Sequence, residues 1–371
     1  MAKLPELCSI QYGYAFDSTC FTEDSTYLPL VRIRDVKRGY SETFYSGNYP
    51  NDYIIDNGSL LVGMDGEFNI ARWKGGKALL NQRVCKITAR KNVDEEYLRF
   101  ALTKALKEIE NRTSFVTVKH LSAKELNRLE IDIPDYRVQI SISGTLTKIE
   151  NIIFTRQQQL QKLDELVKAR FVEMFGDDKY SKMPLINLIT EGAGLSYGIV
   201  QPGDSGTGDM GVLRPVDMVN GEISTHSIKY IDRSIGASFK KTELVGDELL
   251  ITVRGTTGVT ALTDSRFKNM NVTRGIAVIR YDRRKINPIY LNAFLNTDES
   301  QQYIQEHTRG ATLQQINLSD LRVHMIPVPP IELQEKLADF IEQVDKSKVA
   351  VQKSLDEAQL LFDSLMQQYF G

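Results

Sequence analysis

The sequence contains a long duplicated segment, which limits the folds that are possible for it. Thr117–Gly176 aligns with Thr312–Gly371 without a gap, at a constant offset of 195 residues. Only ten of the sixty aligned pairs are identical, but the apolar positions agree, and Phe175-Gly176 falls on Phe370-Gly371 at the end of the sequence. We interpret this pattern as a tandem duplication, in which a domain and a long helix are followed by a second domain and a second long helix.

The later part of each copy has the spacing of a coiled-coil seam. Steps of four and three residues connect Ile142, Leu146, Ile149, Ile153, Arg156, Leu160, Leu163, Val167, Arg170 and Met174 in the first copy. In the second copy they connect Leu337, Ile341, Val344, Lys348, Val351, Leu355, Ala358, Phe362, Leu365 and Tyr369. This seam predicts two helices of about 55–60 Å, and the domain between them favours antiparallel pairing. Two separate core helices are the alternative. Arg156 and Lys348 interrupt the apolar seam, so we expect them to set its register or to face a partner.

The segments before the helices resemble one another with drifting offsets. Val31-Arg32 resembles Leu213-Arg214, Leu60-Leu61 resembles Leu249-Leu250, and Tyr97-Leu98 resembles Tyr290-Leu291, at offsets of 182, 189 and 193 residues. The first segment predicts strands over 27–36, 59–64 and 83–87 and a helix over 95–111. We therefore predict an α+β fold with domains at 1–135 and 184–330, long helices at 136–176 and 331–371, and a linker at 177–183, with internal pseudo-twofold symmetry.

The composition is that of a water-soluble protein. Charged residues make up 25% of the 371 residues and hydrophobic residues 42%, and the net charge is −2. Neither a membrane-spanning run nor a signal peptide is recognisable. The three cysteines are odd in number and lack C-x-x-C spacing, which favours a reducing cytoplasm and argues against zinc.

No catalytic motif stands in a supporting context. Gly206–Gly211 matches the dinucleotide pattern G-x-G-x-x-G, but a loop precedes it and a strand-like run follows it, so we interpret it as a flexible loop. The P-loop pattern for ATP and the Asn/Asp-Pro-Pro-Tyr tetrad of methyltransferases are absent. The four histidines lack metal-ligand spacing. We therefore predict neither a catalytic site nor a metal site.

Basic residues concentrate at equivalent places in the two domains. Residues 68–93 carry seven basic side chains and no acid, and residues 266–285 carry seven against one acid. A solvated strand face is the simplest explanation for any one of them, but the recurrence favours a surface that contacts DNA phosphates and bases. The candidates are Arg32, Arg34, Lys37, Arg38, Arg72, Lys74, Lys77, Arg83, Arg214, Arg254, Arg266, Lys268 and Arg274. Gln314 and Gln315 could also read bases, or could be polar caps at the turn into 316–321.

Several of these segments resemble a known family, the DNA-specificity (S) subunits of type I restriction–modification systems. The resemblance rests on Leu163-Asp164-Glu165-Leu166-Val167 with Phe175-Gly176 at the end of the first helix, on Ile326–Pro330 entering the second, and on Gly246–Ile251 and Asn81–Val84. Ile133-Pro134-Asp135-Tyr136 departs from the family pattern, which has a double proline before the first helix.

The resemblance implies a division of labour. Each domain would be a target recognition domain that reads one half of a bipartite, asymmetric site in double-stranded DNA. The helices would set the gap and dock two modification (methyltransferase) subunits, and restriction (endonuclease/translocase) subunits would join them. S-adenosylmethionine, ATP and magnesium would be held by those partners, with no cofactor in this chain. A coiled-coil adaptor that joins proteins without reading DNA is the alternative.

Overall fold

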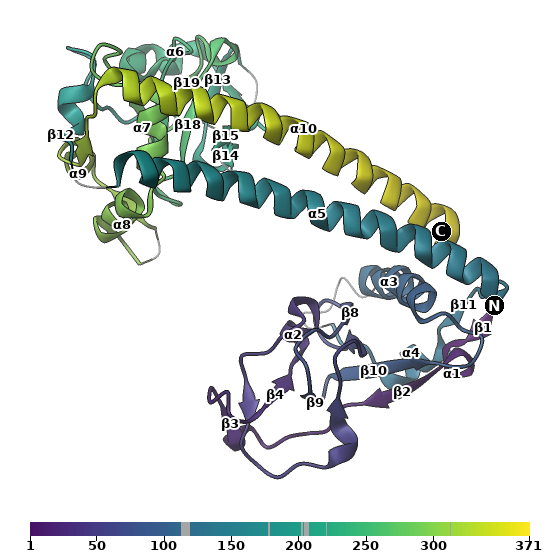
Figure 1. Ribbon diagram of the computed structural model, residues 1–371. Coiled ribbons are helices and arrows are strands. Elements are labelled where there is room, and N and C mark those ends of the chain that lie inside the picture. The colour runs from purple at the N-terminus through teal and green to yellow at the C-terminus, as the bar shows by residue number, and fades with distance from the viewer. Residues whose placement is uncertain (113–118, 177–178, 202, 204–207, 220, 312) are drawn as a thin grey trace. The chain divides into compact units, whose positions relative to one another are not determined.

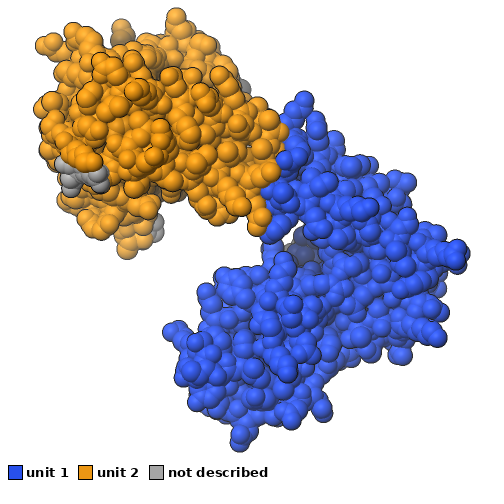
Figure 2. All heavy atoms as spheres, viewed as in Figure 1, with its two compact units in different colours: residues 1–157, 353–371 blue, residues 158–352 orange. Residues whose placement is uncertain are grey.

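The computed structural model describes residues 1–112, 119–176, 179–201, 203, 208–219, 221–311 and 313–371. They form two compact units, one of residues 1–157 with 353–371 and one of residues 158–352 (Figure 2). Figure 1 shows two long helices, α5 (Tyr136–Phe175) and α10 (Ile331–Phe370). Each has 40 residues and belongs partly to one unit and partly to the other. Each unit thus combines a globular segment with a portion of both long helices.

The globular part of the first unit contains short strands and small helices. They are β1 (Ala2–Lys3), α1 (Leu4–Leu7), β2 (Cys8–Tyr12), β3 (Phe21–Thr22), β4 (Leu28–Val31), α2 (Ile33–Arg38), β5 (Phe44–Tyr45), β6 (Ile54–Ile55), β7 (Leu60–Gly63), β8 (Ile70–Arg72), β9 (Ala78–Leu80), β10 (Val84–Ala89), α3 (Glu95–Arg112), α4 (Ala123–Arg128) and β11 (Glu130–Ile131). The expected helix over 95–111 and the strands over 59–64 and 83–87 are confirmed.

Two sheets organise this unit, in the orders β2-β10-β7-β8 and β3-β5-β4-β9-β6, and β1 pairs with β11. Helix α3 covers the first sheet. Its Leu98 and Leu102 are fully buried against the inward side chains of β7 and β10, including Leu60 and Val62. In the second sheet, β4 and β9 are parallel, with Leu30 opposite Leu79 and Val31 opposite Leu80. The residues that follow these two strands therefore leave the sheet at the same edge.

The second unit repeats this plan. Its elements are β12 (Lys182–Pro184), β13 (Met210–Leu213), β14 (Met218–Val219), β15 (Glu222–Ile223), β16 (Lys229–Ile231), α6 (Arg233–Gly236), β17 (Leu249–Thr252), β18 (Thr260–Leu262), β19 (Asn271–Val272), β20 (Ile276–Ile279), α7 (Pro288–Leu295), α8 (Asp298–Glu306), β21 (Thr308–Arg309), β22 (Gln315–Ile316), α9 (Leu318–Arg322) and β23 (Met325–Pro327). The strand orders are β18-β17-β20, β16-β13-β19, β12-β23, β14-β15 and β21-β22. As in the first unit, β13 and β19 are parallel.

The duplication extends to individual hydrogen bonds. The buried Gln139 accepts from the Asp94 N–H (2.9 Å) and donates to the Pro134 carbonyl (2.7 Å). Gln334 accepts from the Asn287 N–H (2.8 Å) and donates to the Pro329 carbonyl (2.8 Å). These bonds connect the start of α5 to the start of α3 in the first unit, and the start of α10 to the start of α7 in the second.

The predicted seam is confirmed by burial, because all ten seam positions of α5 and all ten of α10 are buried or half-buried. In the second unit, Asp164 pairs with Lys348 at 2.5 Å, and the Arg170 guanidinium lies 5.7 Å from the Phe340 ring. From Asp164 to Arg170 the residue numbers rise along α5, whereas those of their partners on α10 fall from 348 to 340. These portions of the two helices therefore run antiparallel. Lys348 is only 29% exposed, consistent with a register-setting role. Neither long helix, nor any other helix in the described ranges, could span a membrane.

Three short segments bear on predictions made from the sequence. The strand expected over 27–36 ends at Val31, because the buried Asp35 carboxylate accepts from the Arg32 N–H (2.9 Å) and starts α2 there. The capping role for Gln314 and Gln315 is wrong, since Asn317 is the N-cap of α9 and Gln315 lies in β22. Residues 206 and 207 of the G-x-G-x-x-G match lie outside the described residues. The run after it is the strand β13, as expected.

Candidate nucleic-acid interface

The parallel strands β4 and β9 of the first unit end at a shallow hollow of about 440 Å³. Its lining combines arginines, amides and aromatic rings, namely Phe16, Ser18, Phe21, Arg32, Ile33, Arg34, Asn81, Gln82 and Arg83. Guanidinium and amide groups are those that read base edges in DNA, and aromatic rings offer stacking surfaces. Three predicted residues, Arg32, Arg34 and Arg83, are therefore brought together.

These three arginines are held in different ways. The Arg32 guanidinium lies 6.0 Å from the Phe21 ring and has no hydrogen bond within the described residues. Arg34 donates to the Thr43 hydroxyl at 3.2 Å. Arg83, at a φ of 72°, lies 3.6 Å from the Asp65 carboxylate and 3.2 Å from a His120 ring nitrogen. All three retain donors that an incoming phosphate or base could accept.

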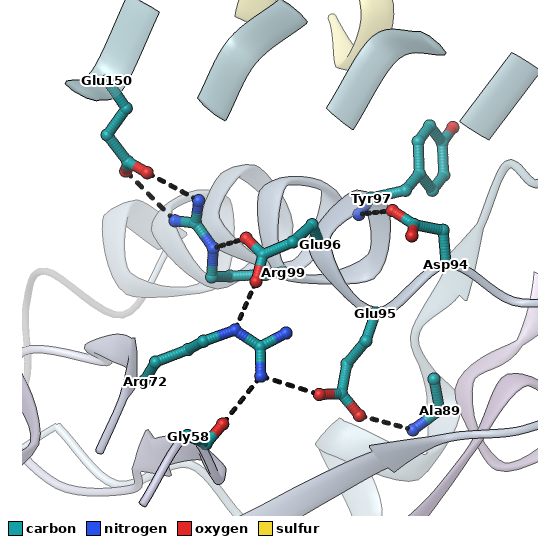
Figure 3. A network of polar contacts seen from close by, with 9 residues as sticks. All are labelled: Gly58, Arg72, Ala89, Asp94, Glu95, Glu96, Tyr97, Arg99 and Glu150. Carbon is teal, nitrogen blue, oxygen red and sulfur yellow. Dashed lines mark hydrogen bonds and ion pairs between the residues drawn. The ribbon is translucent and has the colours of Figure 1, made fainter. Parts of the chain in front are cut away.

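Arg72 belongs to an internal network instead (Figure 3). Its guanidinium pairs with Glu95 at 2.9 Å and with Glu96, and it donates to the Gly58 carbonyl at 2.7 Å. Burial alone would raise the pKa of Glu96, but hydrogen bonds from Arg99 and Arg72 hold that pKa below its usual value. A guanidinium so engaged has few donors left, so DNA contact by Arg72 stays a prediction that the geometry does not favour.

The network continues from α3 to the first long helix. Arg99, whose side chain is 12% exposed, donates to both oxygens of Glu150 on α5 (3.1 and 2.7 Å) and to Glu96 (2.7 Å) (Figure 3). Bidentate pairs of this kind fix direction as well as distance. The strand β8, the helix α3 and the first part of α5 are thus tied by charge as well as by apolar contact.

The remaining candidates of the first unit are exposed. Lys37 and Arg38 make loose pairs with Glu67 (3.9 Å) and Glu42 (3.7 Å). Exposed pairs of this length contribute about 0–1 kcal/mol, so both side chains can be recruited elsewhere. The Lys74 ammonium lies 5.9 Å from the Phe154 ring, and Lys77 is exposed.

In the second unit, two of the four predicted arginines, Arg214 and Arg266, are committed to carboxylates. Arg214 chelates the buried Asp217 (2.8 and 3.0 Å) and donates to the Ser227 carbonyl (2.6 Å). Arg266 chelates Asp264. Within the basic stretch 266–285, Arg280 pairs with Glu248 and Arg283 with Asp247, acids that lie outside the stretch. The density of basic residues in the sequence therefore overstates the free positive charge.

Arg254, Lys268 and Arg274 are the uncommitted candidates of this unit. Their side chains have neither a hydrogen bond nor an ion pair with any residue that the structure describes. The backbone brings two of them close together, because the Val253 N–H donates to the Gly275 carbonyl at 2.8 Å. Arg254 also forms an antiparallel bridge with Gln315. Arg254, Arg274 and Gln315 thus converge, whereas Lys268 lies in the loop before β19.

Sequence reasoning missed several polar residues at these places. Asn81 and Gln82 line the hollow of the first unit, His120 contacts Arg83, and Arg309 pairs across β21 and β22 with Gln315. The signal that could have found them is the parallel strand pair that recurs in both domains, β4 with β9 and β13 with β19. The residues that follow the two strands of each pair lie at the same edge of the sheet. Counting charges along the chain could not reveal uncharged amides at that edge.

The chain is similar to a known family and to several of its members. The family model for the type I restriction modification DNA specificity domain matches residues 1–165 and 205–358. The specificity subunit of the type I restriction enzyme EcoBI from Escherichia coli is 28% identical over 98% of this chain and 83% of its own length. A putative type I restriction enzyme MjaX specificity subunit from Methanocaldococcus jannaschii is 22% identical over 87% of this chain and 81% of its own length.

Solved structures share the fold. The type I restriction–modification S subunit from M. genitalium aligns over 100% of this chain and 95% of its own, with 13% identity and a TM-score of 0.60. A chain from a structural study of complex assembly and conformational transition in a type I R-M system aligns over 100% of this chain and 96% of its own, with 16% identity and a TM-score of 0.51. The predicted α+β architecture with long helices is confirmed.

Proposed function

The chain belongs to the type I restriction modification DNA specificity family, and from this premise we propose that each of its units reads one half of a bipartite, asymmetric DNA target. DNA recognition is the role of the family, and these matches do not favour the adaptor alternative. The proposal concerns how the chain divides that recognition between its units.

The observation that carries the proposal is that the two units share a backbone arrangement but have different side chains at its edge. The ends of β4 and β9 present Arg32, Asn81 and Gln82, whereas at the ends of β13 and β19 Arg214 is bound to Asp217 and Arg274 has no side-chain partner among the described residues. The same backbone with different donors and acceptors is what two readers of unlike half-sites require. Exposed lysines such as Lys74 and Lys77 would contact phosphates and supply affinity without sequence preference.

The long helices would set the gap between half-sites and dock two modification (methyltransferase) subunits. Their outer faces carry exposed apolar side chains, among them Val349 (71% exposed) and Leu360 (73%), which supports a protein partner on this surface. Restriction (endonuclease/translocase) subunits would join the complex. S-adenosylmethionine, ATP and magnesium would be held by those subunits, and this chain would not be catalytic.

The cellular compartment would be the cytoplasm, where the DNA and the partner subunits are. The free thiols of Cys8, Cys20 and Cys85 support this assignment, since thiols persist in a reducing environment.

A segment exchange tests the proposal. Residues 184–330 would be replaced by the corresponding segment of a relative with another target, and the chain would be reconstituted with its modification subunits. We expect one half of the modified sequence to change and the other half and the gap to persist. An exchange that left the modified sequence unaltered would contradict the proposal.

A salt titration separates the proposal from the adaptor. If Lys74 and Lys77 each contact a phosphate, replacing both by Ala should reduce the slope of log affinity against log salt by roughly 1.8. A slope equal to that of the unmodified complex would favour the adaptor.

A further inference from the structure

A polar row crosses three neighbouring segments of the second unit. Gln315 in β22 is paired on one side with Arg309 of β21 and on the other with Arg254, which follows β17. Residues directly opposite each other in antiparallel pairs project from the same face, so the three side chains stand in a row with Gln315 in the middle. The adjacent Ile316 is fully buried on the other face.

The polar groups of this row are largely unused. Among the described residues, the Gln315 amide and the Arg254 guanidinium have no hydrogen-bond partner, although both side chains are half-buried. Arg309 is 72% exposed and lies 3.8 Å from Asp320, a pair that solvent screens. Arg214 and Arg266 of the same unit, by contrast, are chelated by carboxylates. An amide held between two arginines without a partner of its own is suited to an external ligand that both donates and accepts hydrogen bonds.

The backbone frame around the row is the same in both units. Gly255 N–H donates to the Gln314 carbonyl (2.9 Å), as Gly66 N–H donates to the Lys119 carbonyl (2.9 Å). Ile316 N–H likewise donates to Val253 (3.0 Å), as Leu121 N–H donates to Met64 (2.7 Å).

The two paired side chains that project from this frame differ in chemistry between the units. Where the second unit pairs Arg254 with Gln315, the first pairs Asp65 with His120. The same backbone arrangement thus holds an arginine and an amide in one unit, and an acid and a histidine in the other. Positions whose side chains differ while the backbone stays the same are suited to ligand selection, because the fold does not require a particular side chain there.

We propose that Gln315 is a specificity-determining residue of the second unit, its amide bonding the edge of an adenine while Arg254 and Arg309 contact the DNA on either side. The amide can donate to adenine N7 and accept from adenine N6, a pairing that no other base offers in the major groove. This inference rests on the proposed function, since it presupposes that the second unit reads a half-site.

The variant Gln315→Glu tests the inference, because it keeps the shape of the side chain and replaces the donating NH₂ by an acceptor. The chain would be reconstituted with its modification subunits and incubated with a plasmid library of random sequence, and the modified sites would be sequenced. We expect the preference for adenine at one position of one half-site to fall by roughly 5- to 150-fold, with cytosine, whose N4 donates, favoured instead. The other half-site should be unchanged.

Gln305→Glu is the control, because it adds the same charge to an exposed glutamine of the same unit, in α8, outside the polar row. It should leave every base preference as in the unmodified chain. If Gln315→Glu proves too unstable to assemble, Gln315→Met removes the amide without adding charge and should relax the preference at the same position.

The outcomes separate the inference from its premise. A Gln315 variant that modifies the same two-part sequence as the unmodified chain, or that loses activity equally on all sequences, overturns the role of Gln315 and leaves the bipartite reading intact. An unmodified chain that shows no two-part sequence overturns the proposed function itself.

Discussion

At the scale of residues, two buried glutamines explain why the repeat in the sequence is ungapped. Gln139 and Gln334 each bridge the prolines before a long helix to the helix that covers the sheet. A second pair of equivalent bonds lies nearby, where the hydroxyls of Tyr97 and Tyr290 donate to the carbonyls of Asp132 (3.0 Å) and Pro327 (2.9 Å). A shift of one residue in the helix would break these bonds, so register is fixed here while the loops of the globular parts vary in length.

Gln334→Met should therefore destabilise the second unit. The side chain keeps its volume, but the Asn287 N–H and the Pro329 carbonyl lose their partner in a buried place. We expect a loss of about 1–3 kcal/mol in the free energy of unfolding. Urea unfolding followed by circular dichroism measures this loss, and Gln359→Met, at an exposed position of the same helix, is the control. Equal effects of the two variants would show that the bridge has no structural role.

A buried histidine predicts a pH dependence of stability. His324 is 3% exposed, bonds to Ser300 (2.8 Å) and stacks on Tyr303 with 4.1 Å between ring centroids. Burial, together with the positive charges of His307 and Lys182, lowers the pKa of His324 to about 4 from its ordinary 6.5. The unfolded chain takes up a proton at this site below pH 6.5, whereas the folded chain does so only near pH 4. The site thus contributes fully above pH 6.5, and its contribution is lost between pH 6.5 and 4.

The loss should be on the order of 2–3 kcal/mol. Urea unfolding at a series of pH values measures it. His324→Leu, which carries the side chain found at the equivalent position 129 of the first unit, should show a shallower decline over this range. The same decline in both proteins would contradict the assignment.

At the scale of elements, the sequence predicted long helices and sheet strands well, because their periodicity extends over many residues. It missed α2 inside the expected strand 27–36, where one buried carboxylate, Asp35, redirects the backbone. It also misjudged Arg72. A basic residue beside a glycine-rich turn looks like a DNA ligand, and only the fold places Glu95 and Glu96 beside it. Partners that are distant in sequence decide whether a charge is free, so the site was only partly predictable.

Arg72→Leu separates the structural role from the DNA-binding role. Leu262 occupies the equivalent place of β18, so the backbone accepts leucine there. Because Glu95 and Glu96 each lose one charged partner and keep only Ala89 N–H and Arg99, respectively, we expect the unfolding free energy to fall by about 1–3 kcal/mol. The slope of log affinity for DNA against log salt should equal that of the unmodified complex. A slope lowered by about one unit, with stability unchanged, would restore Arg72 as a phosphate contact.

The contact between Asp164 and Lys348 predicts a charge-reversal experiment on the paired helices. Lys348→Asp would place three carboxylates together, since Asp345 lies 3.7 Å from the Lys348 ammonium. We expect a loss of about 1 kcal/mol, with partial recovery in the double variant that also carries Asp164→Lys. A double-mutant cycle of unfolding free energies measures the coupling. Additive effects would mean that the pair does not contribute to register.

At the scale of the whole molecule, a net charge of −2 is compatible with DNA recognition because the positive charge is local. Internal acids neutralise Arg72, Arg214 and Arg266, and the free guanidinium and amide groups gather at a few strand ends. The division into two units and two long helices was recognisable from the duplication alone. Which side chains face DNA was not, since that depends on pairings between segments far apart in the sequence.

We propose that this one chain reads two separate half-sites in DNA. This reading is tested most directly by sequencing the modified positions in random DNA treated with the complex of this chain and its modification subunits. We expect two short specified segments separated by a gap of constant length and free sequence. A single continuous recognition sequence, or modification without sequence preference, would contradict it.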